Sequence, residues 1–282
     1  MATNPGIMVI GQGVTNIPAV VRSPLAWSAR GRTAAMLPTA AVINNFDIGL
    51  LLSQPMAGSL LMTDFNTPSQ FPHQTFKDTS STILQGTSQV TSYNGLGELA
   101  FLTAADNEAA EAQWMCPIIV TGSTPWAFGV RMKVSSVTTE KGSFEIGLSN
   151  AQTLVGNLQA DGGAVPTTST DYLIFNTDAA ATTALDIDYL LSGATHTEHK
   201  AAFHTMVADT YLTAELYYNG TTIATYLNGV ATADTIAATD IVDGNFPAAQ
   251  VCVPTIGVKN SDASAADYIV TLDWIYAVQH GV

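Results

Sequence analysis

Charged side chains are scarce in this sequence. Asp, Glu, Lys and Arg make up 11% of its 282 residues, whereas an ordinary soluble domain contains about 25%. Ala, Thr, Ser, Gly and Asn fill the surface positions that Lys and Glu usually occupy, and these small side chains lose little conformational entropy when a partner covers them. We therefore predict a surface that contacts other subunits, although a hardened extracellular or virion protein has the same composition.

Basic residues are scarcer than acidic ones, 9 against 23, which gives a net charge of −14. An acidic body argues against nucleic-acid binding, because that function needs cations to neutralise phosphates. Residues 1–46 nevertheless contain Arg22, Arg30 and Arg32 and no acid, so they carry +3 and the rest carries 6 − 23 = −17. Because opposite charges steer association, we predict that these arginines bind an acidic partner surface. A disordered tail with a few arginines is the alternative.

Cysteine is nearly absent, and long apolar runs are missing. Cys116 and Cys252 each lie in an apolar run next to a proline. They form neither a metal-binding motif nor a disulfide framework, so we predict buried free thiols. No apolar run reaches the roughly 20 residues that span a bilayer, and no signal-peptide pattern follows Met1. We expect synthesis in the cytosol and no membrane contact.

The first 58 residues contain a Pro or Gly every few positions between short apolar pieces. This density breaks helices and long strands, yet the segment is too apolar to be a solvated tail. We predict an extended N-terminal arm over residues 1–58. It either crosses its own domain or reaches across a neighbouring subunit.

From about residue 59 the pattern changes to short apolar runs between polar turns, which is typical of a sandwich or jelly roll. In 215–230 two aromatic and β-branched runs each end in Asn-Gly, a pair that tolerates the positive φ of tight hairpins. Strands are predicted at 98–103, 115–121, 126–135, 142–149, 171–176, 184–191, 202–208, 211–218, 221–228, 250–259 and 267–279, and a short helix at 104–113. The Ala/Thr-rich stretch 231–240 is predicted to be a loop or a strand edge. The predicted fold is an all-β, antiparallel jelly-roll sandwich over residues 59–282.

Two of these strands alternate apolar and polar residues. In 126–134 and in 268–276 every second position is apolar. Alternate side chains lie on the same face of a strand, so we expect one face of each strand to be buried and the other to face water. Trp126 and Trp274 lie in the apolar phase and are predicted to be core residues rather than a sugar-stacking platform.

The order of short motifs along the body resembles that of a known family. The motifs are GELAFL at 97–102, WAFGVRMKV at 126–134, GLSN at 147–150, LYYNG at 216–220, TYLNG at 225–229, IGVKN at 256–260 and LDWI at 272–275. Their order resembles the concanavalin A-like or laminin-G-like jelly roll, in the version found in virion proteins of tailed phages. The resemblance covers roughly residues 60–282. It implies two curved antiparallel sheets that bind glycans or build capsids and tails, and it implies oligomers, often trimers.

Few residue patterns indicate chemistry. His196 and His199 have a spacing that a metal site can use, but they follow a Gly/Thr-rich stretch, so we interpret them as a solvated loop. Asp186 and Asp188 would share one face of a strand, where two carboxylates can hold Ca²⁺ or serve as an acid/base pair. The solvent face of an alternating strand has the same pattern, and we favour it. No nucleophile motif or dinucleotide motif is present, and we predict no catalytic residue, no metal and no cofactor.

Together these observations predict a structural virion protein. We expect a capsid decoration or cement protein that self-associates as a homotrimer and binds the major capsid protein on the exterior of the virion, after assembly in the host cytoplasm. Arg22, Arg30 and Arg32 are the predicted capsid-binding residues. The alternative is a carbohydrate-binding module of a phage tail or adsorption apparatus. We predict no enzyme activity, since a polysaccharide-degrading enzyme would need paired carboxylates in a sheet groove.

Overall fold

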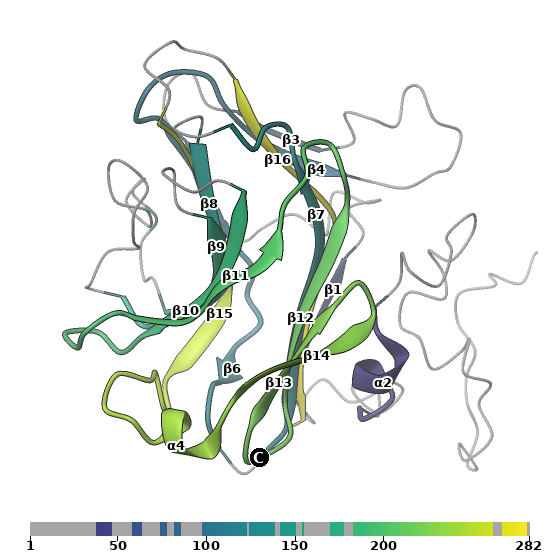
Figure 1. Ribbon diagram of the computed structural model, residues 1–282, viewed down its shortest axis with the longest axis vertical. Coiled ribbons are helices and arrows are strands. Elements are labelled where there is room, and N and C mark those ends of the chain that lie inside the picture. The colour runs from purple at the N-terminus through teal and green to yellow at the C-terminus, as the bar shows by residue number, and fades with distance from the viewer. Residues whose placement is uncertain are drawn as a thin grey trace, which may run out of the picture.

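Two antiparallel β-sheets packed face to face form the body of the protein (Figure 1). The computed structural model describes residues 38–46, 58–63, 74–77, 82–85, 98–122, 124–138, 142–150, 154, 170–177, 183–261 and 267–280. The prediction of an all-β jelly-roll sandwich is confirmed. Within these residues, no helix has both the length and the apolar character needed to cross a membrane.

Sheet A and sheet B each contain eight strands in the described part of the chain. Sheet A has the order β14 (Val230–Ile236), β13 (Ile223–Leu227), β12 (Leu212–Tyr218), β7 (Trp126–Val134), β16 (Tyr268–His280), β4 (Leu99–Thr103) and β3 (Thr82–Gln85), and β1 (Gly58–Thr63) also pairs with β16. Sheet B has the order β11 (Thr197–Thr205), β10 (Ala184–Leu190), β9 (Tyr172–Thr177), β8 (Gly142–Ser149), β15 (Val251–Asn260), β5 (Ala109–Gln113) and β2 (Gln74–Lys77), and β6 (Ile118–Ile119) also pairs with β15. Two short helices, α2 (Ala40–Ile43) and α4 (Ala238–Ile241), complete the described elements.

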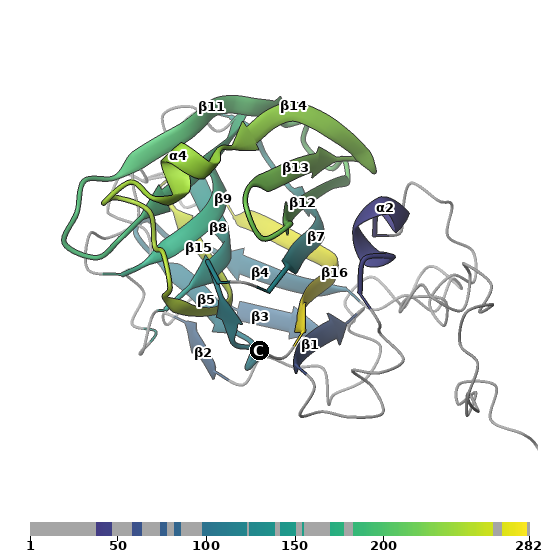
Figure 2. The same ribbon diagram turned by 90° about the horizontal axis from the view of Figure 1, so that it is seen from below.

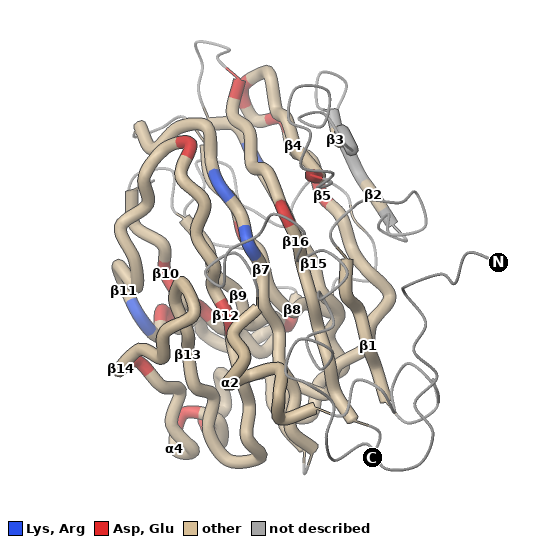
Figure 3. Tube along the Cα trace, turned by 90° about the vertical axis from the view of Figure 1, so that its right-hand side faces the viewer, with Lys and Arg blue, Asp and Glu red and all other residues tan. Residues whose placement is uncertain are grey.

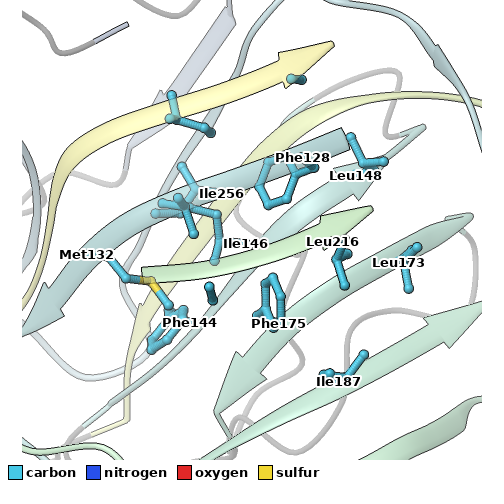
Figure 4. Close-up of a cluster of buried hydrophobic side chains, with 14 of the residues drawn as sticks. Phe128, Met132, Phe144, Ile146, Leu148, Leu173, Phe175, Ile187, Leu216 and Ile256 are labelled. Carbon is cyan, nitrogen blue, oxygen red and sulfur yellow. The ribbon is translucent and has the colours of Figure 1, made fainter. Parts of the chain in front are cut away.

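The core lies between the two sheets (Figure 4). Alternate residues of the central strands enter it, for example Phe144, Ile146 and Leu148 of β8. Cys116 and Cys252 are buried free thiols, as predicted, and burial raises the pKa of Cys116 to about 12. Charged residues are sparse along the strands of both sheets (Figure 3), in line with the low charge of the sequence.

The Asn-Gly hairpins are confirmed. β12 pairs with β13, and β13 pairs with β14, both antiparallel. At the second turn Asn228 and Gly229 have φ values of 49° and 82°, the left-handed region that this dipeptide adopts at low cost. The stretch predicted to be a loop or strand edge contains β14. It forms a strand despite its weak apolar pattern because it pairs with β13.

The helix predicted at 104–113 is wrong. Residues Ala109–Gln113 form β5, which is paired on one side with β15 and on the other with β2. The alanines that suggested a helix are small residues buried in the sheet, so sheet pairing overrides their helix propensity. β11 also begins at Thr197, five residues before the predicted strand.

β16 contains a bulge that changes the side on which its aromatic residues lie. Its register with β7 shifts between Leu272 and Trp274, and one extra residue reverses the side on which the following side chains lie. Trp274 is buried, as expected, but on the outer face of sheet A together with Tyr276, whereas Trp126 lies in the core between the sheets. The prediction of which side of β16 faces water is therefore wrong from Trp274 onward, where Ile275 and Ala277 lie in the core.

Residues 38–46 cover that outer face of sheet A, with α2 beside it (Figure 2). Val42, Ile43 and Phe46 pack in one buried cluster with Trp274 and its neighbours. This part of the predicted arm thus crosses its own sandwich. Residues 1–37 and 47–57, which include Arg22, Arg30 and Arg32, lie outside the described residues, and the arm boundary at residue 58 stays a prediction.

Candidate functional site

The outer face of sheet B is polar although it is buried. Core residues alternate along β8, so Ser143 and Glu145 point to the opposite side of the sheet. The polar side chains of this face are each at most 4% exposed: Glu111, Gln113, Ser143, Glu145, Ser149, Tyr172, Asn176, Asp188 and Thr255. Buried polar groups at this density need hydrogen-bond partners, which makes the face the candidate site.

Strand register places four acidic or amide side chains in one row, which ends at Asp186 of β10, opposite Asn176. Glu145 of β8 lies opposite Asn176 of β9 on one side and opposite Gly257 of β15 on the other. Gly257 in turn lies opposite Glu111 of β5. The two glutamates therefore flank a strand position that has no side chain, and Asn176 stands directly beside Glu145.

A small apolar patch lies next to this row. Ile174 of β9 packs with Tyr172 and Leu190, and it lies opposite Asp188 of β10 on one side and Gly147 of β8 on the other. The face thus combines an apolar centre with a polar rim.

Four oxygen atoms of this rim have no hydrogen-bond partner among the residues that the structure describes. They are Glu145 Oε2, Tyr172 OH, Asn176 Oδ1 and Asp188 Oδ1, and all four are buried. Leaving a buried polar atom without a partner costs about 1–3 kcal/mol. Native proteins contain few such atoms per 100 residues, so their concentration on one face points to a group that binds there.

The electrostatics of the site are dominated by its carboxyl groups. Burial, and then the negative charge of Glu111, raise the pKa of Glu145 well above its ordinary value of 4.5. Burial also raises the pKa of Tyr172, with further contributions from the charges of Asp188 and Glu145. Both shifts mean that the site disfavours additional negative charge.

His196 is the basic partner of this face. Its Nε2 lies 3.0 Å from Asp188 Oδ2, and this hydrogen bond is the main reason that the pKa of His196 is raised. His199 instead lies 3.9 Å from Asp240 Oδ2 and packs against Tyr189. The interpretation as a solvated loop is wrong for His199, which lies in β11. His196 does lie in the loop that ends before Thr197, but there it is bonded to Asp188.

The predicted placement of Asp186 and Asp188 on one face of a strand is confirmed, but the solvent-face interpretation is wrong for Asp188, which is 3% exposed. Asp186 Oδ1 accepts a hydrogen bond of 2.5 Å from the backbone N–H of Ala202. No group of three or more His, Cys, Asp or Glu side chains able to hold a metal ion occurs within the described ranges.

The sequence interpretation missed the other members of the site. Glu145 and Asn176 lie in correctly predicted strands, on the phase opposite to the apolar residues, and that phase was the available signal. Glu111 was missed because residues 104–113 were predicted to be a helix, so no strand face was considered there. The three predicted arginines lie outside the described residues, so the structure gives them no position in the site.

Solved structures that resemble this chain are lectins and related jelly rolls. Peanut lectin superposes with a TM-score of 0.52 at 13% identity, covering 79% of this chain and 98% of the lectin. A protein of unknown function from Shewanella oneidensis gives 0.53 at 12% identity, covering 83% and 93%, and the Crh5 transglycosylase in complex with NAG gives 0.50 at 16%, covering 80% and 85%. No family model matches the chain, and no curated protein matches it in sequence.

The fold is therefore a concanavalin A-like, lectin-like jelly roll, and the resemblance that the motif order suggested is confirmed at the level of fold. At these identities the likeness concerns the fold alone. The connection to phage virion proteins stays a prediction.

Proposed function

We propose that this chain is a carbohydrate-binding protein whose ligand lies on the outer face of sheet B. The observation that carries the proposal is the set of four buried oxygen atoms without partners around the apolar residue Ile174. Asn176 Oδ1 and Asp188 Oδ1 are acceptors, and the Tyr172 hydroxyl and the protonated Glu145 carboxyl can accept or donate, so the set suits a ligand that presents several hydrogen-bonding groups. A saccharide offers hydroxyl donors at its edge and an apolar C–H face for the centre.

The fold supports the same class of ligand. Peanut lectin is a carbohydrate-binding protein by name, and the transglycosylase was solved in complex with NAG. These proteins share only the jelly roll with this chain. The proposal therefore depends on the side chains of sheet B and not on the identity of the neighbours.

A glycan array followed by calorimetry tests the proposal. The full chain should bind at least one saccharide class, and Asn176→Ala should weaken binding about two- to tenfold, since a hydrogen bond from a ligand to a buried acceptor is worth about 0.5–1.5 kcal/mol. Asp243→Asn, an exposed carboxyl outside the site, is the matched control and should bind like wild type. A blank array, or equal affinity for wild type and Asn176→Ala, would reject the site.

The burial of the site also predicts how the ligand enters. A ligand reaches side chains that are at most 4% exposed only after neighbouring residues move. Association should then be slower than the 10⁵–10⁷ M⁻¹s⁻¹ typical of preformed surfaces. Stopped-flow Trp fluorescence measures the rate, and a rate near the diffusion limit would contradict binding at this face.

The prediction that the protein is not an enzyme belongs to this proposal. We expect that the glycan that binds best keeps its chain length after prolonged incubation with the protein. Chromatography of the glycan before and after incubation measures this directly. Shortened products that depend on Glu145 would overturn it.

Capsid decoration is the second candidate, favoured by the sparse surface charge and by the contrast of +3 in residues 1–46 with −17 in the rest. Its partners would be the major capsid protein and two further copies of this chain on the virion exterior, with Arg22, Arg30 and Arg32 in the capsid contact. Deleting residues 1–37 should abolish capsid binding and keep a folded body. The deletion must stop before Pro38, because residues 38–46 pack on sheet A. Full capsid binding by the truncated protein would refute this candidate.

A further inference from the structure

The outer face of sheet B carries more acidic than basic side chains. Five acids share this face, Glu111, Glu145, Asp186, Asp188 and Glu198, as the register of their strands shows. Two basic residues accompany them: His196, which is bonded to Asp188, and Lys259, which lies two positions along β15 from Gly257. The acids therefore outnumber the bases by three, and by two while Glu145, whose pKa is raised, holds its proton.

Three of the atoms without partners come from neighbouring positions. Asn176 lies opposite Glu145, and Asp188 lies opposite Ile174, two residues from Asn176 on the same face of β9. Side chains at such opposite and diagonal positions are about 5–8 Å apart at Cβ. Asn176 Oδ1 can therefore share one small group of the ligand with Glu145 Oε2 on one side or with Asp188 Oδ1 on the other, while β9 separates Glu145 from Asp188.

We propose that this group is a primary ammonium, so that the preferred ligand is an amino sugar rather than a neutral one; the inference rests on the saccharide site proposed above. An ammonium supplies three N–H donors, enough to serve Asn176 Oδ1 and Glu145 Oε2 together. A hydroxyl supplies one. Its positive charge also opposes the excess of acids, which a neutral sugar leaves uncompensated.

The pKa values agree with this assignment. Glu145 and Tyr172 both have raised pKa values, and in each case nearby carboxylates add to the effect of burial. A bound cation would act in the opposite direction. The net charge of −14 also favours the approach of a cationic ligand over an anionic one.

A matched set of three hexasaccharides tests the inference. β-1,4-linked glucose, N-acetylglucosamine and glucosamine hexamers share one backbone and differ only at carbon 2, which carries a hydroxyl, an acetamide or an amine. Binding is measured by calorimetry at about pH 5.5, where the amine carries its charge. We expect the glucosamine hexamer to bind at least tenfold more tightly than either of the others, because hydrogen bonds between charged groups are the stronger class.

Two variants assign the preference to the site. Glu145→Gln keeps the size of the side chain but cannot ionise when the ammonium binds, and it should reduce the preference for the amine to less than threefold while the variant stays folded by its thermal midpoint. Asp243→Asn should keep the full preference. If Glu145→Gln fails to fold, Asp188→Asn provides the same comparison.

The outcomes separate this inference from the saccharide proposal. Equal affinity for the three hexamers, or binding of the neutral hexamer alone, overturns the ammonium and leaves the saccharide site intact. Simple alkylammonium ions that bind as tightly as the glucosamine hexamer support the ammonium and overturn the saccharide. No binding of the glucosamine hexamer overturns the inference whatever the glycan array shows.

Discussion

Glu145→Gln should change the pH dependence of stability in the absence of ligand. Burial, assisted by Glu111, raises the pKa of Glu145 well above 4.5 in the folded protein, whereas the unfolded chain ionises this carboxyl near its ordinary value. Between the two pKa values the folded state holds a proton that the unfolded state has released. The stability contributed by this group is therefore complete below about pH 4.5 and is lost as the pH rises toward the folded pKa.

The size of the effect follows from linkage. One proton of difference between the two states changes the free energy of unfolding by about 1.4 kcal/mol per pH unit. Wild type should lose about this much per pH unit relative to Glu145→Gln above about pH 5, until the carboxyl ionises in the folded protein. The raised pKa of His196 also makes stability fall with rising pH, but both proteins share it and it cancels in the difference.

Urea unfolding followed by Trp fluorescence between about pH 5 and 8 gives the two profiles, with the free energy taken by linear extrapolation. Asp243→Asn, which alters an exposed carboxyl, should run parallel to wild type. Parallel profiles for wild type and Glu145→Gln would mean that Glu145 is solvated, and the reasoning about the site would fail with it. Saturation with the ligand should flatten the wild-type profile, since a bound donor stabilises the ionised carboxylate.

Three further predictions concern the scaffold. Gly129→Ala should destabilise the protein by about 3 kcal/mol, because its Cβ would lie 2.3 Å from a ring carbon of Tyr276; Gly244→Ala, with no atom within 4 Å, should change stability by less than about 0.5 kcal/mol, and equal effects would contradict the packing. Phe46→Ala should cost about 3 kcal/mol in urea unfolding, because Phe46 holds residues 38–46 to sheet A, and no loss would show that this segment contributes little. Both cysteines should resist a thiol reagent in the native protein and react in urea, so rapid native labelling would contradict their burial.

The sequence predicted those parts of the fold whose signals are local. The Asn-Gly turns and the core phase of 126–134 each depend on neighbouring residues, and both appear as expected. The other side of that strand faces water only in part, because Ala127 is buried against residues 38–46. The prediction failed for β5 because its alanines favour a helix locally, whereas pairing with β15 and β2 decides its conformation. The face on which Trp274 lies was predicted wrongly because the bulge depends on the register between β16 and β7. An alternation pattern contains no information about that register.

The site was harder to predict than the fold. Its members come from four strands, β5, β8, β9 and β10, and each strand contributes only one or two polar residues. On its own strand Glu145 is a single acid on the polar phase, which is what any exposed strand has. Only the pairing of strands brings it beside Asn176, and only burial distinguishes it from a surface residue.

The two outer faces of the sandwich treat a buried carboxyl in opposite ways. On sheet A, Glu215 accepts hydrogen bonds from the backbone N–H of Thr39, from the Thr39 hydroxyl and from the Tyr276 hydroxyl. On sheet B, Glu145 Oε2 has no partner among the described residues, although it is as deeply buried. The chain thus completes the first face with its own residues 38–46, at the point where Gly129 leaves room for Glu215 and Tyr276. Since the same fold supplies donors to one carboxyl and withholds them from the other, the donors for Glu145 are expected to come from a ligand.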